Sequence, residues 1–87
     1  MKNHNLLLVD DDRQLLDSMA VWLREQGYSV FTAESCRQAR EQIESHPLDL
    51  VLVDVRLNDG DGFEVLAWCR QHHPQLTVVL ITGSIWA

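Results

Sequence analysis

Three aspartates of this chain have the type and the spacing to bind a divalent cation. Asp10 and Asp11 follow the apolar run 6–9, and Asp54 follows a second apolar run, 48–53. Continuous Leu and Val runs of this length are typical of strands buried on both faces of a parallel sheet. Sites in open α/β sheets form beyond the carboxyl ends of the strands, so neighbouring strands would bring these acids into one pocket. Carboxylates at such short distances repel one another unless they share a proton or a cation. Mg²⁺ favours oxygen ligands of this kind.

The rest of the chain alternates between strand and helix patterns. Strands are predicted at 5–9, 28–32, 49–53 and 76–81, and helices at 12–26, 36–45 and about 63–71. Gly27, Pro47 and Pro74 stand where these helices must stop. Alternation of this kind predicts parallel strands, right-handed crossovers and helices on both faces, which is a doubly wound α/β sheet.

Each predicted helix has one apolar face. The first face consists of Leu15, Leu16, Met19, Ala20 and Leu23, and the second of Cys36, Ala39 and Ile43. The third helix has Phe63, Leu66 and Ala67 on one stripe, together with Arg70. Ser35, followed three residues later by Gln38, is a capping box at the start of the second helix. The two cysteines, Cys36 and Cys69, match no metal motif or disulfide framework, so we expect small buried thiols.

Length and charge limit the class of protein. Eighty-seven residues form at most one domain, and the 46% apolar fraction is ordinary for a globular protein. The net charge of -6 and the pI near 4.9 argue against direct binding of nucleic acid or of an anionic membrane. No apolar stretch approaches the ~20 residues of a membrane span, and we see no signal peptide, so we expect a cytoplasmic protein.

Four short motifs together resemble the receiver domain of bacterial response regulators. They are Val9-Asp10-Asp11-Asp12, Asp54 after the third strand, Asp61-Gly62 at the start of a helix, and Thr82-Gly83 after the fourth strand. Each motif is weak alone, but all four stand in order at the correct ends of elements, and the resemblance covers residues 5–83. It implies a flavodoxin- or CheY-like sheet with strand order 2-1-3-4. The third acid of the first motif is similar to that of receivers attached to transcription activators.

The resemblance implies a role for each matching residue. Asp54 would accept a phosphoryl group from the phosphohistidine of a sensor histidine kinase. Asp11, Asp54 and the backbone carbonyl of Arg56 would bind Mg²⁺ directly, and Asp10 would hold the metal mostly through water. The hydroxyl of Thr82 would bond the phosphoryl group and act as the switch. The chain would then be a signalling module and not a turnover enzyme, although it would promote its own phosphorylation and dephosphorylation.

The sequence departs from the family pattern in two places. Asn58 stands where many receivers have a proline. The absence of this proline is expected to loosen the loop after Asp54, although Asn tolerates turn geometry. Receiver domains normally have a fifth strand and further helices, which carry a lysine and a switch aromatic. This sequence has no counterpart of them, so residues 1–87 are predicted to be a receiver domain incomplete at the C-terminus. The open edge of the fourth strand would favour a homodimer or a swapped oligomer.

Other interpretations compete with this one. A receiver fold kept for dimerisation, independent of phosphorylation, would also explain the missing lysine, and Mg²⁺ titration would separate the two functions. A hydrolase of the aspartyl-phosphate type needs a second acid two residues after Asp54, where this chain has Arg56. Taken singly, Asp12 is typical of a helix cap, and Asp59 and Asp61 are typical of turn or cap residues.

Overall fold

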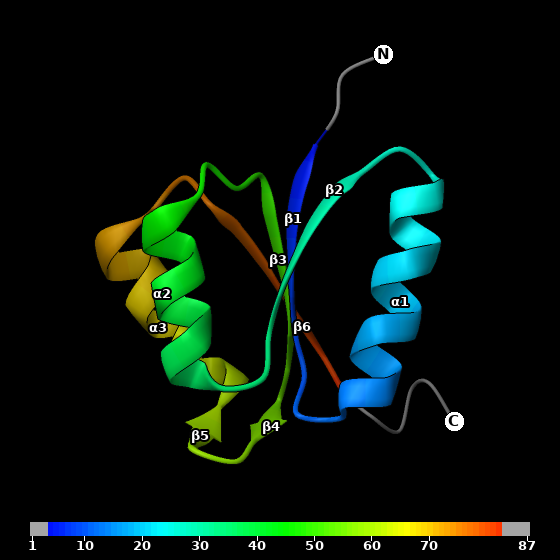
Figure 1. The fold of residues 1–87 in the computed structure, drawn as a ribbon. Coiled ribbons are helices and arrows are strands. Elements are labelled where there is room, and N and C mark those ends of the chain that lie inside the picture. Colours follow the sequence, from blue (N-terminus) through cyan, green and yellow to red (C-terminus); the bar gives the residue numbers. More distant parts are fainter. Residues whose placement is uncertain (1–3, 83–87) are drawn as a thin grey trace.

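The computed structural model describes residues 4–82 and places a parallel sheet between two layers of helices (Figure 1). Along the chain the elements are β1 (Asn5–Val9), α1 (Arg13–Glu25), β2 (Ser29–Ala33), α2 (Cys36–Ser45), β3 (Leu50–Asp54), β4 (Arg56–Leu57), β5 (Gly60–Asp61), α3 (Gly62–His72) and β6 (Thr77–Ile81). No helix in this range is long and apolar enough to cross a membrane. The helices and the long strands follow one another in the predicted order β-α-β-α-β-α-β, and each lies within about two residues of its predicted bounds.

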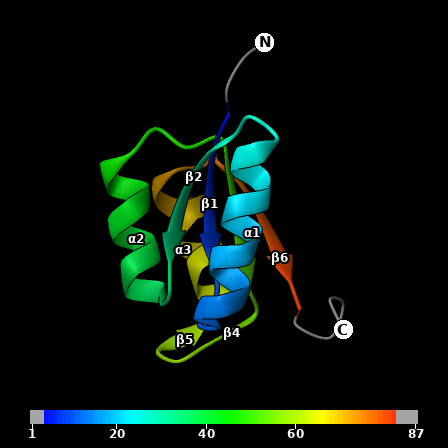
Figure 2. The same ribbon diagram turned by 45° about the vertical axis from the view of Figure 1, so that its right-hand side comes forward.

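The main sheet has the order β2-β1-β3-β6, with all neighbours parallel. Because β4 and β5 belong to a separate small hairpin, β6 is the fourth strand of the main sheet and the predicted order 2-1-3-4 is confirmed. The register places Val9 opposite Val53 and Asp54 opposite Ile81, so the carboxyl ends of β1, β3 and β6 meet at one edge. Figure 2 shows β1 beside β2 with α1 in front of them.

The two faces of the sheet are covered unequally. Helices α2 and α3 cover one face and α1 alone lies on the other (Figure 1). The core under α2 and α3 is the larger and includes Leu7, Val9, Ala33, Cys36, Ala39, Ile43, Val51, Val53, Leu57, Val65 and Cys69, whereas the core under α1 consists of Leu8, Leu16, Ala20 and Val30. Alternate residues of β1 enter different cores because successive side chains of a strand point to opposite faces. The central strands are thus buried on both sides, as their continuous apolar runs predict.

The ends of the first two helices follow from local chemistry. Asp12 is the N-cap of α1, and its carboxylate accepts a hydrogen bond from the Leu15 N–H at 3.2 Å. Gly27 follows this helix with φ 101°, in the left-handed region that favours glycine. Ser35 caps α2 by accepting from the Gln38 N–H at 3.0 Å, as the capping-box pattern predicts.

The predicted apolar face of the third helix is wrong. The buried residues of α3 are Gly62, Val65 and Cys69, whereas Phe63 is 56% exposed and Leu66 is half-buried. Apolar residues lie almost all round this helix, so the sequence offered no clear stripe. Val65 and Cys69 join the larger core, and the first residue of the helix, Gly62, packs directly on the end of β3.

The segment after Asp54, whose turn-forming residues predict a loop, contains a short hairpin. Residues Arg56–Leu57 and Gly60–Asp61 pair antiparallel, with Asn58 and Asp59 in the turn between them. This hairpin lies below the carboxyl end of the sheet in Figure 1, beside the start of α2. Within residues 4–82, β6 is an edge strand, and its Val79 is 40% exposed.

Candidate metal centre at the carboxyl edge of the sheet

The carboxyl groups of Asp10, Asp11 and Asp54 converge at the ends of β1 and β3. Each contributes one oxygen to a group in which all the oxygens lie within 4.8 Å of one another. The pairing of Val9 with Val53 explains this approach, because it sets the residue that follows β1 beside the last residue of β3. The sequence alone predicted this convergence, and the geometry matches it.

Asp10 is the buried member of the group, with only 6% of its surface exposed. Its N–H donates to the Ala33 carbonyl at 3.1 Å, and its carboxylate accepts from the Asp12 N–H at 2.8 Å. Burial raises the pKa of Asp10, and the negative charges of Asp54, Asp11 and Asp12 raise it further, against the lowering effect of the Asp12 N–H. A buried carboxylate among like charges is a site where a cation would be favourable.

Among residues 4–82, no cationic side chain is paired with the acidic group. Asp11 is exposed and Asp54 is half-buried, and in the part of the chain that the structure describes no arginine or histidine forms a salt bridge with either, or with Asp10. Oxygen donors, a cluster of negative charges and partial access to solvent suit a hard divalent cation such as Mg²⁺, which keeps several waters. The donor set therefore fits the metal that the sequence predicted.

The backbone after Asp54 is held by hydrogen bonds on both sides. The Val55 N–H donates to the Ile81 carbonyl at 2.9 Å, and the Gly62 N–H donates to the Val55 carbonyl at 2.8 Å. The Arg56 N–H approaches the Asp54 carboxylate at 3.4 Å, a long contact. These bonds tie the start and the end of the segment to the sheet.

Gly62 is required by its contact with the last residue of β3. A Cβ atom at this position would lie 2.6 Å from the Asp54 carbonyl oxygen and 2.8 Å from Leu80 Cδ2. Real Cβ atoms essentially never approach that closely. The sequence singled out Asp61-Gly62 only as a motif, and the structure gives the physical reason for the glycine.

Thr82 follows directly after β6, next to Ile81, the residue that pairs with Asp54. It is half-buried, and its place in the chain puts it at the edge of the sheet where β3 ends. Gly83, the second residue of the predicted motif, lies outside the described residues.

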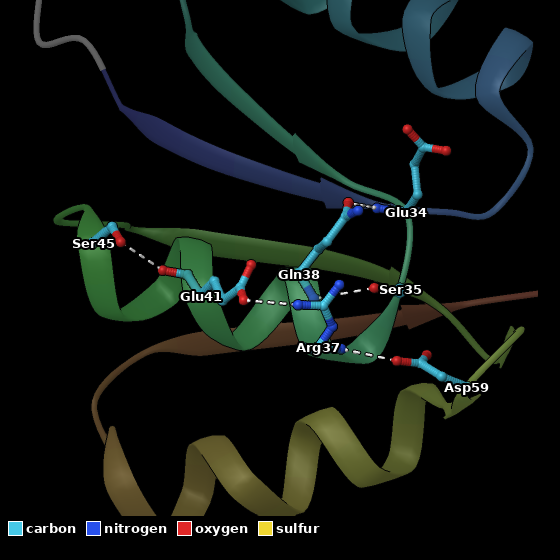
Figure 3. A network of polar contacts seen from close by, with 7 residues as sticks. All are labelled: Glu34, Ser35, Arg37, Gln38, Glu41, Ser45 and Asp59. Atoms are coloured by element: carbon cyan, nitrogen blue, oxygen red, sulfur yellow. Dashed lines mark hydrogen bonds and ion pairs between the residues drawn. The ribbon is translucent and has the colours of Figure 1, made fainter.

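The other two acids of this region act as helix caps. Asp61 is the N-cap of α3 and accepts from the Glu64 N–H at 2.9 Å. The carboxylate of Asp59 accepts from the N–H groups of Cys36 and Arg37 at 2.8 and 3.0 Å. Figure 3 shows the bond to Arg37. Sequence patterns predicted a turn or cap role for Asp59, but not that it caps a helix 23 residues earlier in the chain.

The sequence matches the response regulator receiver domain over residues 6–85. The chain therefore belongs to this family. Its relatives include the alginate biosynthesis transcriptional regulatory protein AlgB of Pseudomonas aeruginosa, 38% identical over 94% of this chain, and the transcriptional regulatory protein GlrR of Escherichia coli, 38% identical over 97%. The chain spans 18% and 19% of these two proteins, about a fifth of their length.

Solved receiver structures share the fold. A CheY-like receiver domain protein from Methanospirillum hungatei superposes with a TM-score of 0.89 at 32% identity, covering 94% of this chain and 66% of that one. The response regulator TrrA of Thermotoga maritima, solved in complex with Mg(2+)-BeF, gives a TM-score of 0.87 at 29% identity, covering 92% and 70%. The CheY-like, doubly wound class is thus confirmed. The chain is a receiver module of two-component signalling, related to transcriptional regulators, and receivers in general are not turnover enzymes.

Proposed function

We propose that this receiver accepts a phosphoryl group on Asp54 from a sensor histidine kinase, with Mg²⁺ held by Asp10, Asp11, Asp54 and the backbone carbonyl of Arg56. The observation that carries the proposal is the convergence of three carboxylates within 4.8 Å, without a cationic partner among residues 4–82. Membership of the receiver family and the solved Mg(2+)-BeF complex of TrrA support it.

The transfer step is a displacement at phosphorus. A carboxylate oxygen of Asp54 forms the new P–O bond while the P–N bond to the donor imidazole breaks, and the departing nitrogen takes a proton from solvent. When bound, Mg²⁺ would neutralise the phosphoryl oxygens and align donor with acceptor. Asp54 is half-buried, so one side of its carboxyl group can reach a partner protein while the sheet fixes the other side. Hydrolysis of the acyl phosphate by water would end the signal.

We assign to Thr82 the role of binding the phosphoryl group once it forms on Asp54. An acyl phosphate carries about −1.5 to −2 charges, so a hydroxyl at the same sheet edge gains a strong acceptor when it forms. Thr82 follows the β6 residue that pairs with Asp54, a position from which a small movement of the strand end would bring the hydroxyl to the phosphoryl group. Such a movement can bias a two-state segment. The output is proposed to be transcription, because the related whole proteins are named as transcriptional regulators.

The experiment is labelling with acetyl phosphate, a small phosphodonor, with and without Mg²⁺. Phosphate incorporation is followed by intact mass, and the acyl phosphate is reduced with borohydride so that the labelled residue can be identified. We expect one phosphoryl group, on Asp54, in the presence of Mg²⁺ and almost none after chelation. Asp54→Asn should abolish the label, and Asp17→Asn, an exposed acid on α1, is the matched control.

A chain that binds no Mg²⁺ and takes no label would contradict the proposal. That result would favour the second function, an interaction module independent of phosphorylation that assembles through the open edge of β6. Sedimentation measurements address the edge directly, since a homodimer or swapped oligomer would sediment faster than the monomer.

A further inference from the structure

The hairpin that follows Asp54 is docked on the first turn of α2 by three hydrogen bonds. Two are the N–H groups of Cys36 and Arg37 donating to the Asp59 carboxylate at 2.8 and 3.0 Å. The third is the Cys36 thiol, which donates to the Asp61 carbonyl at 3.5 Å. Figure 3 shows Asp59 reaching from the hairpin to the start of α2, on the side away from the Arg37–Glu41 ion pair.

These contacts complete the N-terminus of α2. The first four N–H groups of a helix have no partner within it. In α2, the Ser35 hydroxyl accepts from the Gln38 N–H, and the Asp59 carboxylate accepts from the Cys36 and Arg37 N–H groups. A carboxylate at this end also interacts favourably with the helix dipole. The pKa of Asp59 is lowered chiefly because the Cys36 and Arg37 N–H groups stabilise its ionised form. The contact is therefore an ionised cap supplied from a distant segment.

The same carboxylate restrains the backbone next to the acceptor. Val55 is tied to β6 through the Ile81 carbonyl, and Asp59 ties the tip of the hairpin to α2, so Arg56 lies between two fixed points. Asn58 and Asp59 form the hairpin turn, and Asn58 stands where many receivers have a proline. Asp59, itself a residue of this turn, ties the turn to α2 through its carboxylate.

We propose that Asp59 is a positioning residue, a latch that fixes the acceptor hairpin against α2 and thereby presents the Arg56 carbonyl to the metal. The proposal rests on the proposed function, since the Arg56 carbonyl matters only if the acids bind Mg²⁺. Removing groups that orient metal ligands typically weakens metal binding by 10–100-fold. Because Asp59 acts through several residues of hairpin, we expect Asp59→Ala to weaken Mg²⁺ binding by about tenfold, the lower end of that range.

The test is an amide NMR titration of the 87-residue chain with Mg²⁺. Dissociation constants are fitted from the amides of residues 10–12 for the native protein and for Asp59→Ala, Asp59→Asn and Asp49→Ala. Asp49 is the matched control, because its exposed carboxylate also accepts a backbone N–H, that of Asn5 at 2.8 Å, but at the opposite end of β3. Asp59→Asn keeps one acceptor oxygen and should recover part of the affinity.

Each outcome decides one claim. A tenfold weaker affinity in Asp59→Ala, unchanged in Asp49→Ala, would support the latch even if both variants lose similar stability. Equal affinities in all four proteins would overturn it. If Mg²⁺ shifts no amide of the native chain, the proposed function fails, and the latch is then judged by hydrogen exchange of the Gly62 amide. That amide, bonded to Val55, should exchange several-fold faster in Asp59→Ala, and unchanged exchange would refute the latch.

Discussion

Replacing Gly62 with alanine tests how tightly the third helix is built against the acceptor. The new Cβ would lie 2.6 Å from the Asp54 carbonyl oxygen and 2.8 Å from Leu80 Cδ2. Leu80 is half-buried and can adjust its side chain, but the carbonyl belongs to the backbone of β3. An ordinary contact begins at 3.4 Å, so α3 or the end of β3 must move by about 0.8 Å or more. The substitution therefore strains Asp54, the residue proposed to accept the phosphoryl group.

The expected cost follows from two opposing effects. Overpacking of a close-packed site costs typically about 1–3 kcal/mol. Alanine recovers about 0.4–1 kcal/mol by restricting the unfolded chain. The net loss in the free energy of unfolding is about 1–2 kcal/mol. In a domain of this size that loss lowers the melting temperature by roughly 5–15 °C.

The assay combines thermal unfolding with the rate of acetyl phosphate labelling. Gly27→Ala is the matched control, because Gly27 has φ +101° but no atom within 4 Å of its would-be Cβ. That variant should lose about 1 kcal/mol through backbone strain alone and keep the native labelling rate. Gly62→Ala should lose stability and also label Asp54 several-fold more slowly. Native stability together with a native rate in Gly62→Ala would refute the reasoning.

The remaining predictions concern the metal, the latch and the thiols. Mg²⁺ at ten times its dissociation constant should stabilise the native chain by about 1.4 kcal/mol, and Asp11→Asn should remove most of that gain in a thermal melt. Because the pKa of Asp59 is lowered from 3.8, its stabilising effect is present above that pH and is lost as the pH falls through the lowered pKa. Urea unfolding should therefore show that Asp59→Asn loses less stability on acidification than the native chain. Burial raises the pKa of Cys36 and Cys69 to about 11, so alkylation by iodoacetamide at pH 8 should be slow until urea exposes both thiols.

The strands and the acids at their ends could be predicted from the sequence because their signals are local. The apolar runs before Asp10 and Asp54 are continuous, and strands buried on both faces require that pattern. Parallel pairing then dictates that their carboxyl ends meet at one edge, which fixes the neighbourhood of the acids. The N-terminal caps of α1 and α2 could also be predicted from the sequence, since Asp12 and Ser35 lie within three residues of their partners.

The features that escaped prediction depend on contacts between distant segments. The buried residues Val65 and Cys69 of α3 belong to the core shared with α2 and the sheet, and no periodicity within the helix reveals them. Asp59 bonds Cys36 and Arg37 across more than 20 residues of chain, so its cap role is invisible to a local pattern. Two-residue strands, such as β4 and β5, likewise lack any alternation to detect.

Paramagnetic mapping with Mn²⁺, displaced by excess Mg²⁺, tests the central claim most directly. Mn²⁺ occupies Mg²⁺ sites and broadens amide signals according to their distance from the ion. The account predicts that broadening is strongest for residues 10–12 and 54–57, and that Mg²⁺ reverses it. Broadening centred on other acids, such as Asp17 or Asp49, or spread evenly over the surface, would contradict a metal site built by Asp10, Asp11 and Asp54.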